Sequence, residues 1–129
     1  MANEDSVSKD IAINWLKEPE EHDYPAAESY LKLTFDDSAT AALVRDLRRA
    51  AVGGFKAKDI FRASGLPLLG ISNSHVEKDR KKILAGKELS PLLLVRDKTR
   101  GRVIIADGYH RMCAVYAIDE DAVIPCKIV

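Results

Sequence analysis

The residues best suited to chemistry lie together in one stretch, 104–114, near the end of the chain. This stretch predicts an apolar strand that ends at Asp107 and Gly108 and runs straight into a helix. The first backbone N–H groups of such a helix have no partner within the helix, and they point into the space beyond the strand. Because N–H groups in this position attract anions, the turn is a candidate anion site.

The side chains of the turn also fit an anion site. Gly108 lets another backbone or a phosphate group come close, because it has no side chain. His110 and Arg111 place one titratable and one permanent positive charge in the first helical turn. Positive charges there oppose the helix dipole, so a sequence that accepts this cost is expected to hold an anion. The alternative is that Arg111 pairs with Asp107 and that His110 packs in the core.

The elements that would position this turn form an α/β unit over residues 66–129. Short apolar runs separated by polar turns are typical of strands buried on both faces. Charged or mixed stretches between them have the composition and the closing glycines of helices. The expected order is a strand at 66–71, a helix at 75–85, strands at 92–95 and 103–106, a helix at 109–118 and a strand at 123–129.

Residues 1–65 are expected to form a helical extension packed on this unit, so that the whole chain is one compact domain. A short helix is predicted at 26–33, after Pro25. A second helix begins at the N-cap candidates 36–38 and is expected to end at Gly53 and Gly54. A third helix is predicted at 56–63.

Composition limits the class of protein. The chain has 129 residues, of which 47% are hydrophobic and 31% are charged, as in a single soluble globular domain. No apolar run approaches the roughly 18 residues that a bilayer span needs. Residues 1–9 are polar and lack the features of a signal peptide, so a cytoplasmic location is expected, and the first dozen residues are expected to fray. Cys113 and Cys126 are predicted to be buried, reduced thiols, because two cysteines are too few for a disulfide scaffold.

The charge of the chain is unevenly distributed, although the formal net charge is zero. Residues 1–40 carry 3 basic and 10 acidic side chains, a net charge of −7, and residues 41–129 carry a net charge of +7. The acidic part could mask the basic part within the molecule, face a partner protein, or simply form a solvated helix face.

A family resemblance rests on two motifs. Gly108, Arg111 and Ala114 form a Gly-x-x-Arg-x-x-Ala pattern, and residues 124–128 form an Ile-Pro-x-x-Ile strand after the next helix. In this strand order the motifs resemble the fold shared by the N-terminal domains of ParB partitioning proteins and by sulfiredoxin. The resemblance covers residues 66–129, about half of the chain. It implies an α/β unit with a mixed sheet, preceded here by the helical extension.

The resemblance also implies nucleotide binding. In that family the glycine and arginine turn holds the phosphates of ATP or CTP, which here maps to Gly108, Tyr109, His110 and Arg111. Tyr109 stands where sulfiredoxin has its reactive cysteine, so sulfinic acid repair is not expected. No helix-turn-helix domain follows the unit, so a partitioning role is not expected either. The Asp-Gly-x-His-Arg sequence looks most like the free-serine kinase branch of the fold.

Further nucleotide contacts are expected from the start of the charged helix. In the family this segment helps to hold the nucleotide, so Asn73, Ser74, His75 and Lys78 are candidates. The alternative is that Ser72 or Ser74 caps the helix and that the lysine is solvated. No Walker loop, paired-histidine metal motif or Gly-x-Ser-x-Gly elbow occurs, so a Mg²⁺ ion would arrive with the nucleotide, held by its phosphates and by Asp107.

Three functions follow from these observations. The first is a nucleotide-dependent phosphotransferase or NTPase in which Asp107 and His110 are catalytic. The second is a non-catalytic nucleotide-sensing or protein-binding module whose acidic helical extension meets a protein partner. The third is DNA binding by a helix-turn-helix over 57–66 and 74–83, which the long intervening turn and the zero net charge disfavour. The acceptor substrate and the oligomeric state are not indicated by the sequence.

Overall fold

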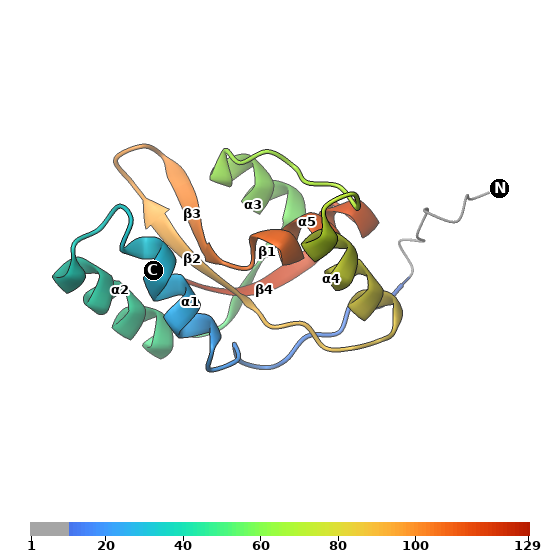
Figure 1. Cartoon of the computed structure of the whole chain (residues 1–129), viewed down its shortest axis with the longest axis horizontal. Coiled ribbons are helices and arrows are strands. Elements are labelled where there is room, and N and C mark those ends of the chain that lie inside the picture. The colour runs from blue at the N-terminus through green and yellow to red at the C-terminus, as the bar shows by residue number, and fades with distance from the viewer. Residues whose placement is uncertain (1–10) are drawn as a thin grey trace.

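The computed structural model describes residues 11–129, which form five helices and one mixed, open sheet of four strands (Figure 1). This confirms the α/β class and the helices near the N-terminus. The fraying expected for the first dozen residues mostly concerns residues 1–10, which lie outside the described part. The elements are α1 (Asp23–Leu31), α2 (Asp37–Arg49), β1 (Gly53–Lys56), α3 (Ala57–Ser64), α4 (Ser74–Leu84), β2 (Leu92–Asp97), β3 (Arg102–Asp107), α5 (Tyr109–Ile118) and β4 (Val123–Ile128).

The sheet has the strand order β1-β4-β2-β3. β2 and β4 run parallel, and the outer pairs β1–β4 and β2–β3 are antiparallel. In the β2–β3 register Leu93 is paired with Asp107 while Leu94 is paired with Ile105, so Ala106 is an extra residue in β3. A bulge of this kind turns the chain locally and redirects the side chains beside it. The bulge thus sets the direction of Asp107 at the end of the strand.

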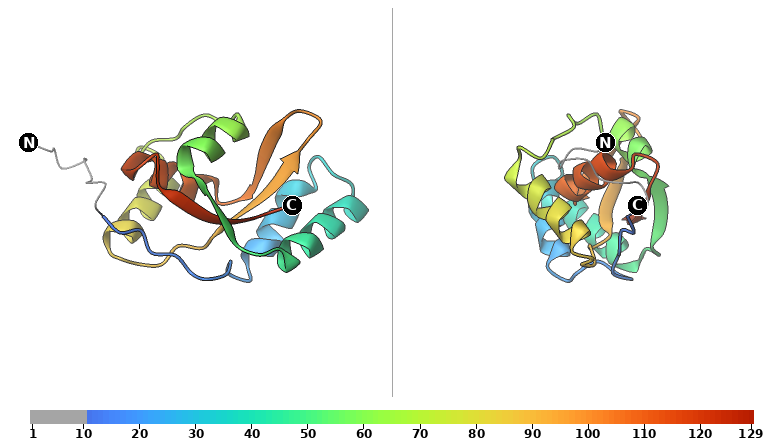
Figure 2. Two further views of the ribbon diagram at one scale, coloured as in Figure 1. Left: turned by 180° about the vertical axis from the view of Figure 1, so that it is seen from behind. Right: turned by 90° about the vertical axis from the view of Figure 1, so that its right-hand side faces the viewer.

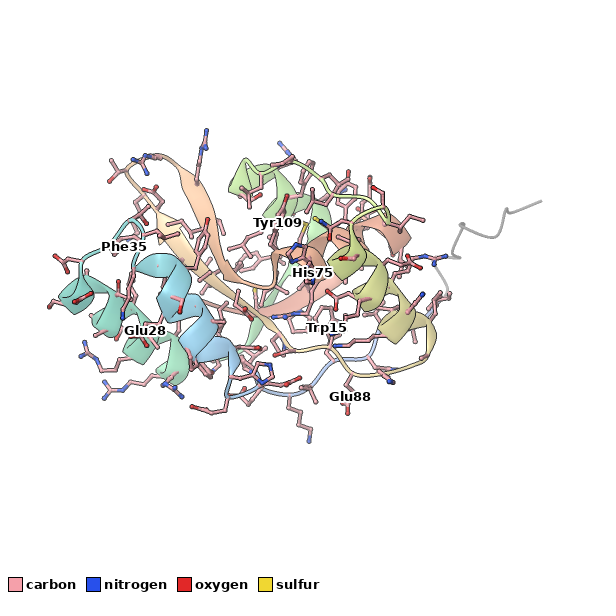
Figure 3. The ribbon with its side chains drawn as sticks, in the orientation of Figure 1. Trp15, Glu28, Phe35, His75, Glu88 and Tyr109 are labelled. Carbon is pink, nitrogen blue, oxygen red and sulfur yellow. The ribbon has the colours of Figure 1, made fainter. Side chains whose placement is uncertain are left out.

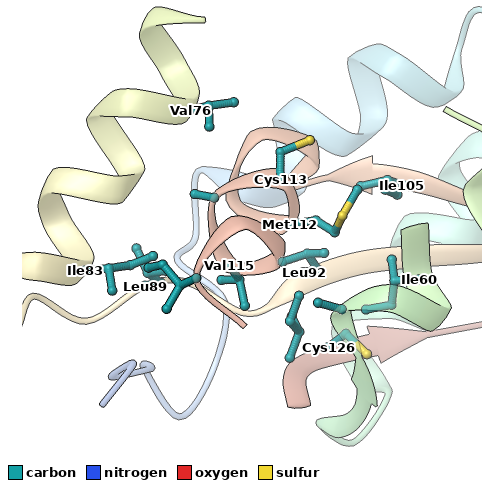
Figure 4. Packing of buried hydrophobic residues seen from close by; sticks show 14 of the residues in the cluster. Ile60, Val76, Ile83, Leu89, Leu92, Ile105, Met112, Cys113, Val115 and Cys126 are labelled. Atoms are coloured by element: carbon teal, nitrogen blue, oxygen red, sulfur yellow. The ribbon is translucent and has the colours of Figure 1, made fainter. Parts of the chain in front are cut away.

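The alternation of β2 shows that helices cover both faces of the sheet. Leu92 and Leu94 belong to a core cluster with α3, α4 and α5, which Figure 4 shows from close by. Leu93 and Val95 belong to a second cluster with α1 and α2. The two views in Figure 2 show these helices on either side of the strands. A strand buried on both faces reads as a continuous apolar run, which is why 92–95 could be recognised from the sequence.

Most of the predicted elements are confirmed, and two predictions are wrong. Residues 66–71 form no regular strand, because Pro67 cannot donate to a ladder and the run pairs with no other strand. The second helix ends at Arg49, not at Gly53 and Gly54, and these two glycines instead begin β1. β1 is an exposed edge strand with two glycines, so it carries no alternating pattern that would predict a strand.

The acidic run of the extension folds back onto basic residues of the same chain. The Lys127 side chain is only 2% exposed, and its ammonium lies 3.3 Å from a carboxylate oxygen of Glu18 and donates to the carbonyl oxygen of Arg48 at 2.9 Å. Arg48 in turn pairs with Glu21 at 2.6 Å. Part of the charge asymmetry is therefore neutralised within the molecule.

Two further expectations bear on the class of protein. Both cysteines are buried and unpaired, as predicted. None of the described helices combines the length and the apolar character that a bilayer crossing requires. α3 and α4 are separated by residues 65–73, and each packs against α5, so no tight turn joins them into a helix-turn-helix.

Candidate functional site

The start of α5 has the geometry expected of an uncapped helix. Gly108 is the N-cap residue, with φ of +108°, and no side chain accepts a hydrogen bond from the first turn. A Cβ atom at Gly108 would lie 2.6 Å from Leu92 Cγ and 3.0 Å from Arg111 Nη2. Glycine is therefore required at this position because Leu92 fills the space that a side chain would take. The sequence analysis expected a phosphate or another backbone in this space.

Arg111 is held by carboxylates and a carbonyl below the turn. Its Nη2 donates to Asp107 Oδ2 at 2.9 Å and to the carbonyl oxygen of Pro91 at 3.5 Å, and it lies 3.8 Å from Asp23 Oδ2. The pairing of Arg111 with Asp107 that the sequence left open is thus present. Arg111 Nε is buried and has no hydrogen-bond partner among the described residues. An unpaired buried donor costs about 1–3 kcal/mol.

Asp107 is bound to Arg111 and does not cap the helix. One of its oxygens accepts the Arg111 hydrogen bond, and α5 has no side-chain cap. Burial raises the pKa of the Asp107 carboxyl, and nearby Asp23 raises it further, while the Arg111 guanidinium lowers it. Asp107 is therefore a partly buried carboxyl at the edge of the turn, and it forms an ion pair with Arg111.

Asp23 is a residue near the turn that the sequence analysis missed. It is the first residue of α1, is only 3% exposed, and accepts a hydrogen bond from the hydroxyl of Ser90. The Ser90 oxygen also accepts from the backbone N–H of Glu20 at 3.0 Å. Asp23 looked like one member of an exposed acidic run, and only its place directly before a helical pattern set it apart. The extension therefore supplies a buried carboxylate close to Arg111.

A polar cavity of about 170 Å³ lies between α4 and the first turn of α5. We call it the α4–α5 pocket. It brings together the predicted residues of the turn with His75 and Lys78, and it adds Asp79 and Lys82, which the sequence analysis did not assign to the site. Its lining is His75, Lys78, Asp79, Lys82, Asp107, Gly108, Tyr109, His110 and Arg111.

Two of the predicted contacts do not line this pocket. Asn73 Oδ1 accepts from the backbone N–H groups of His75 and Val76, at 3.0 and 3.2 Å, so Asn73 caps α4. The predicted alternative of capping was therefore right in kind but named the wrong residue, because it named Ser72 or Ser74. Ser74 lines a neighbouring groove of about 640 Å³ along α4.

Lysines of α4 join the pocket to this groove. Lys78 and Lys82 line both hollows, and Lys81 and Lys87 line the groove alone. None of these four lysines forms an ion pair within the described part of the chain. Their charges are therefore available to an anionic ligand, in contrast to Arg48 and Lys127, which are already paired.

Three aromatic rings line the α4–α5 pocket. The His75 and His110 rings lie 4.9 Å apart between centroids, and the Tyr109 and His110 rings lie 5.4 Å apart. Figure 3 labels His75 and Tyr109 near the centre of the molecule, close to the start of α4. The Tyr109 hydroxyl donates to the carbonyl oxygen of Pro67. Burial lowers the pKa of His110, as do His75 and Arg111, while Asp79 opposes this shift.

The pocket contains carboxylates and histidines, which are possible metal ligands. Among residues 11–129, no group of three His, Cys, Asp or Glu side chains is arranged to hold a metal. The contact between Asp107 and a nucleotide's Mg²⁺ ion thus remains a prediction.

No family model, no curated protein and no solved structure matches the chain.

Proposed function

We propose that the protein binds a nucleoside di- or triphosphate, such as ATP, ADP or CTP, with its phosphates in the α4–α5 pocket. The observation that carries this proposal is the meeting of unpaired lysines from α4 with the uncapped start of α5. Lys78 and Lys82 supply positive charge, and the backbone N–H groups after Gly108 supply hydrogen bonds. The resemblance of the 108–114 turn to the ParB and sulfiredoxin family agrees with this assignment.

Arg111 has a different role from the lysines in this proposal. Its Nη2 donates hydrogen bonds to Asp107 and to the carbonyl oxygen of Pro91, so the guanidinium is fixed in place before a ligand binds. A fixed charge at the pocket wall strengthens phosphate binding because little side-chain entropy is lost when the ligand binds. Asp107 and Asp23 are then positioning residues for Arg111.

Calorimetry with ATP, ADP, CTP and inorganic triphosphate, each with magnesium, tests the proposal. Lys78→Ala is expected to weaken binding by about 1 kcal/mol, and Arg111→Ala by about 1.5–3 kcal/mol, the range for hydrogen bonds to charged groups. Lys98→Ala is the matched control, because Lys98 is an exposed lysine on the β2–β3 turn that lines neither hollow. Absence of binding in the wild type, or equal affinity for Lys78→Ala and wild type, would refute the proposal.

A second candidate function is phosphoryl transfer or nucleotide hydrolysis at the same place. The lowered pKa of His110 favours a neutral imidazole near pH 7, which is able to accept a proton. His110 lines the pocket beside Asp107, which carries a carboxylate at the same wall. These two residues are the candidates for catalysis, and the non-catalytic alternative is a nucleotide-sensing module that binds and does not turn over.

A further inference from the structure

A second hollow adjoins the α4–α5 pocket on the side of α1 and β3. It has a volume of about 400 Å³, and it shares Asp107, Gly108, Tyr109 and His110 with the α4–α5 pocket. Residues 107–110 thus form a common wall between the two hollows. The remaining lining of the second hollow is Tyr30, Leu66, Ile105 and Ala106.

The chemistry of the two hollows differs sharply. Beyond the common wall, the α4–α5 pocket gains three cationic side chains, from Lys78, Lys82 and Arg111, against one carboxylate, from Asp79. The second hollow gains no charged side chain beyond that wall, and its own residues are aromatic or aliphatic. A ligand that spans both hollows would therefore carry a charged group at one end and, at the other, an uncharged group with an apolar face.

Tyr30 gives the second hollow an exposed aromatic ring. Its side chain is 47% exposed at the last turn of α1, and within residues 11–129 it makes no hydrogen bond or ring contact. An exposed aromatic ring without a partner is a surface on which a planar group can stack. Figure 1 shows β3 passing between α1 and α3, so that α1 reaches the side of the strand that leads to the turn.

The opposite side of the second hollow is fixed by hydrogen bonds. The Tyr109 hydroxyl donates to the carbonyl oxygen of Pro67, and the Leu66 backbone N–H donates to Ser64 Oγ at 3.2 Å. These bonds hold Leu66 and the ring of Tyr109 in place. The hollow is thus largely formed before a ligand arrives, and its volume falls in the range of about 300–1,000 Å³ that is usual for ligand sites.

We propose that the second hollow is a nucleobase subsite, in which the base of the bound nucleotide stacks on Tyr30 and packs against Leu66. The proposal rests on the proposed function, since the phosphates of the same nucleotide occupy the α4–α5 pocket. The sugar then lies over the common wall, beside His110. Stacking tolerates every base, so the subsite would add affinity for nucleosides in general, without strong selection of one base.

Comparing ATP with inorganic triphosphate tests the subsite, because the two ligands share the phosphates and differ in the nucleoside. Calorimetry of Tyr30→Ala is expected to show ATP affinity reduced about five-fold or more, as for the loss of one stacked base, and triphosphate affinity within about two-fold of wild type. Tyr30→Phe keeps the ring and is expected to keep ATP affinity. Leu33→Ala is the matched control, because Leu33 is an exposed residue close to α1 that does not line the hollow.

The outcomes separate the subsite from the phosphate site. Unchanged ATP affinity in Tyr30→Ala, or an equal loss for ATP and triphosphate, overturns the nucleobase subsite. Wild-type protein that binds triphosphate as tightly as ATP also overturns it, and leaves the phosphate site intact. Wild-type protein that binds neither ligand overturns the proposed function, and the subsite with it.

Discussion

Replacing Gly108 by alanine probes the turn on which the site depends. Two costs are expected, one from the backbone and one from packing. The φ of +108° is one that L-residues rarely adopt, and left-handed conformations cost them about 1–2 kcal/mol. The new Cβ would also lie 2.6 Å from Leu92 Cγ, and Leu92 is fully buried, so overpacking adds about 1–3 kcal/mol. The expected loss of unfolding free energy is about 2–5 kcal/mol.

Gly101→Ala is the matched control for this experiment. Gly101 also has a positive φ, of +65°, but nothing lies within 4 Å of the position that its Cβ would take. Its replacement is expected to cost only the backbone part, about 1–2 kcal/mol. Urea unfolding of the two variants and of wild type, with the slopes compared, measures both losses. Equal destabilisation by the two substitutions would show that Leu92 and Arg111 do not crowd Gly108.

The same pair of variants connects the turn with binding. The Arg111 Nη2 atom lies 3.0 Å from the position of the new Cβ, so Gly108→Ala should displace the guanidinium as well as Leu92. Triphosphate affinity is therefore expected to fall in folded Gly108→Ala and to stay at the wild-type level in Gly101→Ala. Unchanged affinity in Gly108→Ala would mean that Arg111 does not contribute to the site.

Three further predictions concern titratable groups. The pKa of His110 is lowered in the folded protein, first by burial and then by His75 and Arg111, so the stability that is present above the ordinary pKa of 6.5 is lost as the pH falls from that value through the lowered one. Urea unfolding at pH 7.5 and 5.5 should show a larger loss for wild type than for His110→Asn. Burial raises the pKa of Cys126 to about 11 and also raises that of Cys113, so thiol reagents at pH 8 should label neither cysteine until the protein unfolds, and rapid labelling of native protein would contradict this. Asp107→Asn keeps an oxygen that accepts the Arg111 hydrogen bond, so nucleotide affinity should change little while any hydrolysis or transfer is lost; retention of full turnover would remove Asp107 from catalysis.

The elements around the turn could be predicted because their patterns are local. The apolar run at 92–95 is buried on both faces, and the helix at 109–118 follows directly from Gly108. β1 could not be predicted, because its four residues are exposed and owe their strand conformation to pairing with β4, about 70 residues further along the chain. A short edge strand of this kind depends on its partner and not on its own sequence.

The candidate site was partly predictable for the same reason. The turn follows from a strand that runs into a helix and from the attraction of anions to a helix start, whereas Lys78 follows from the family resemblance. Lys82 lies one helical turn after Lys78, so the two fall on the same face, which is a signal the sequence does contain. Asp23 and Tyr30 carry no such signal, because their places near Arg111 and beside Leu66 depend on how α1 packs on β3.

α1 covers the sheet and also brings two side chains to the candidate site. An extension that merely shields the sheet would bury apolar side chains and leave its polar ones in water. α1 does bury Ala27 and Leu31, but it also carries Asp23 to within 3.8 Å of Arg111 and places Tyr30 in the hollow that adjoins the turn. Both residues lie on a helix that packs on β3, the strand that leads into Gly108. A ligand bound at the turn would therefore contact elements from both halves of the chain, and its binding would stabilise α1 against the sheet as well as the turn itself.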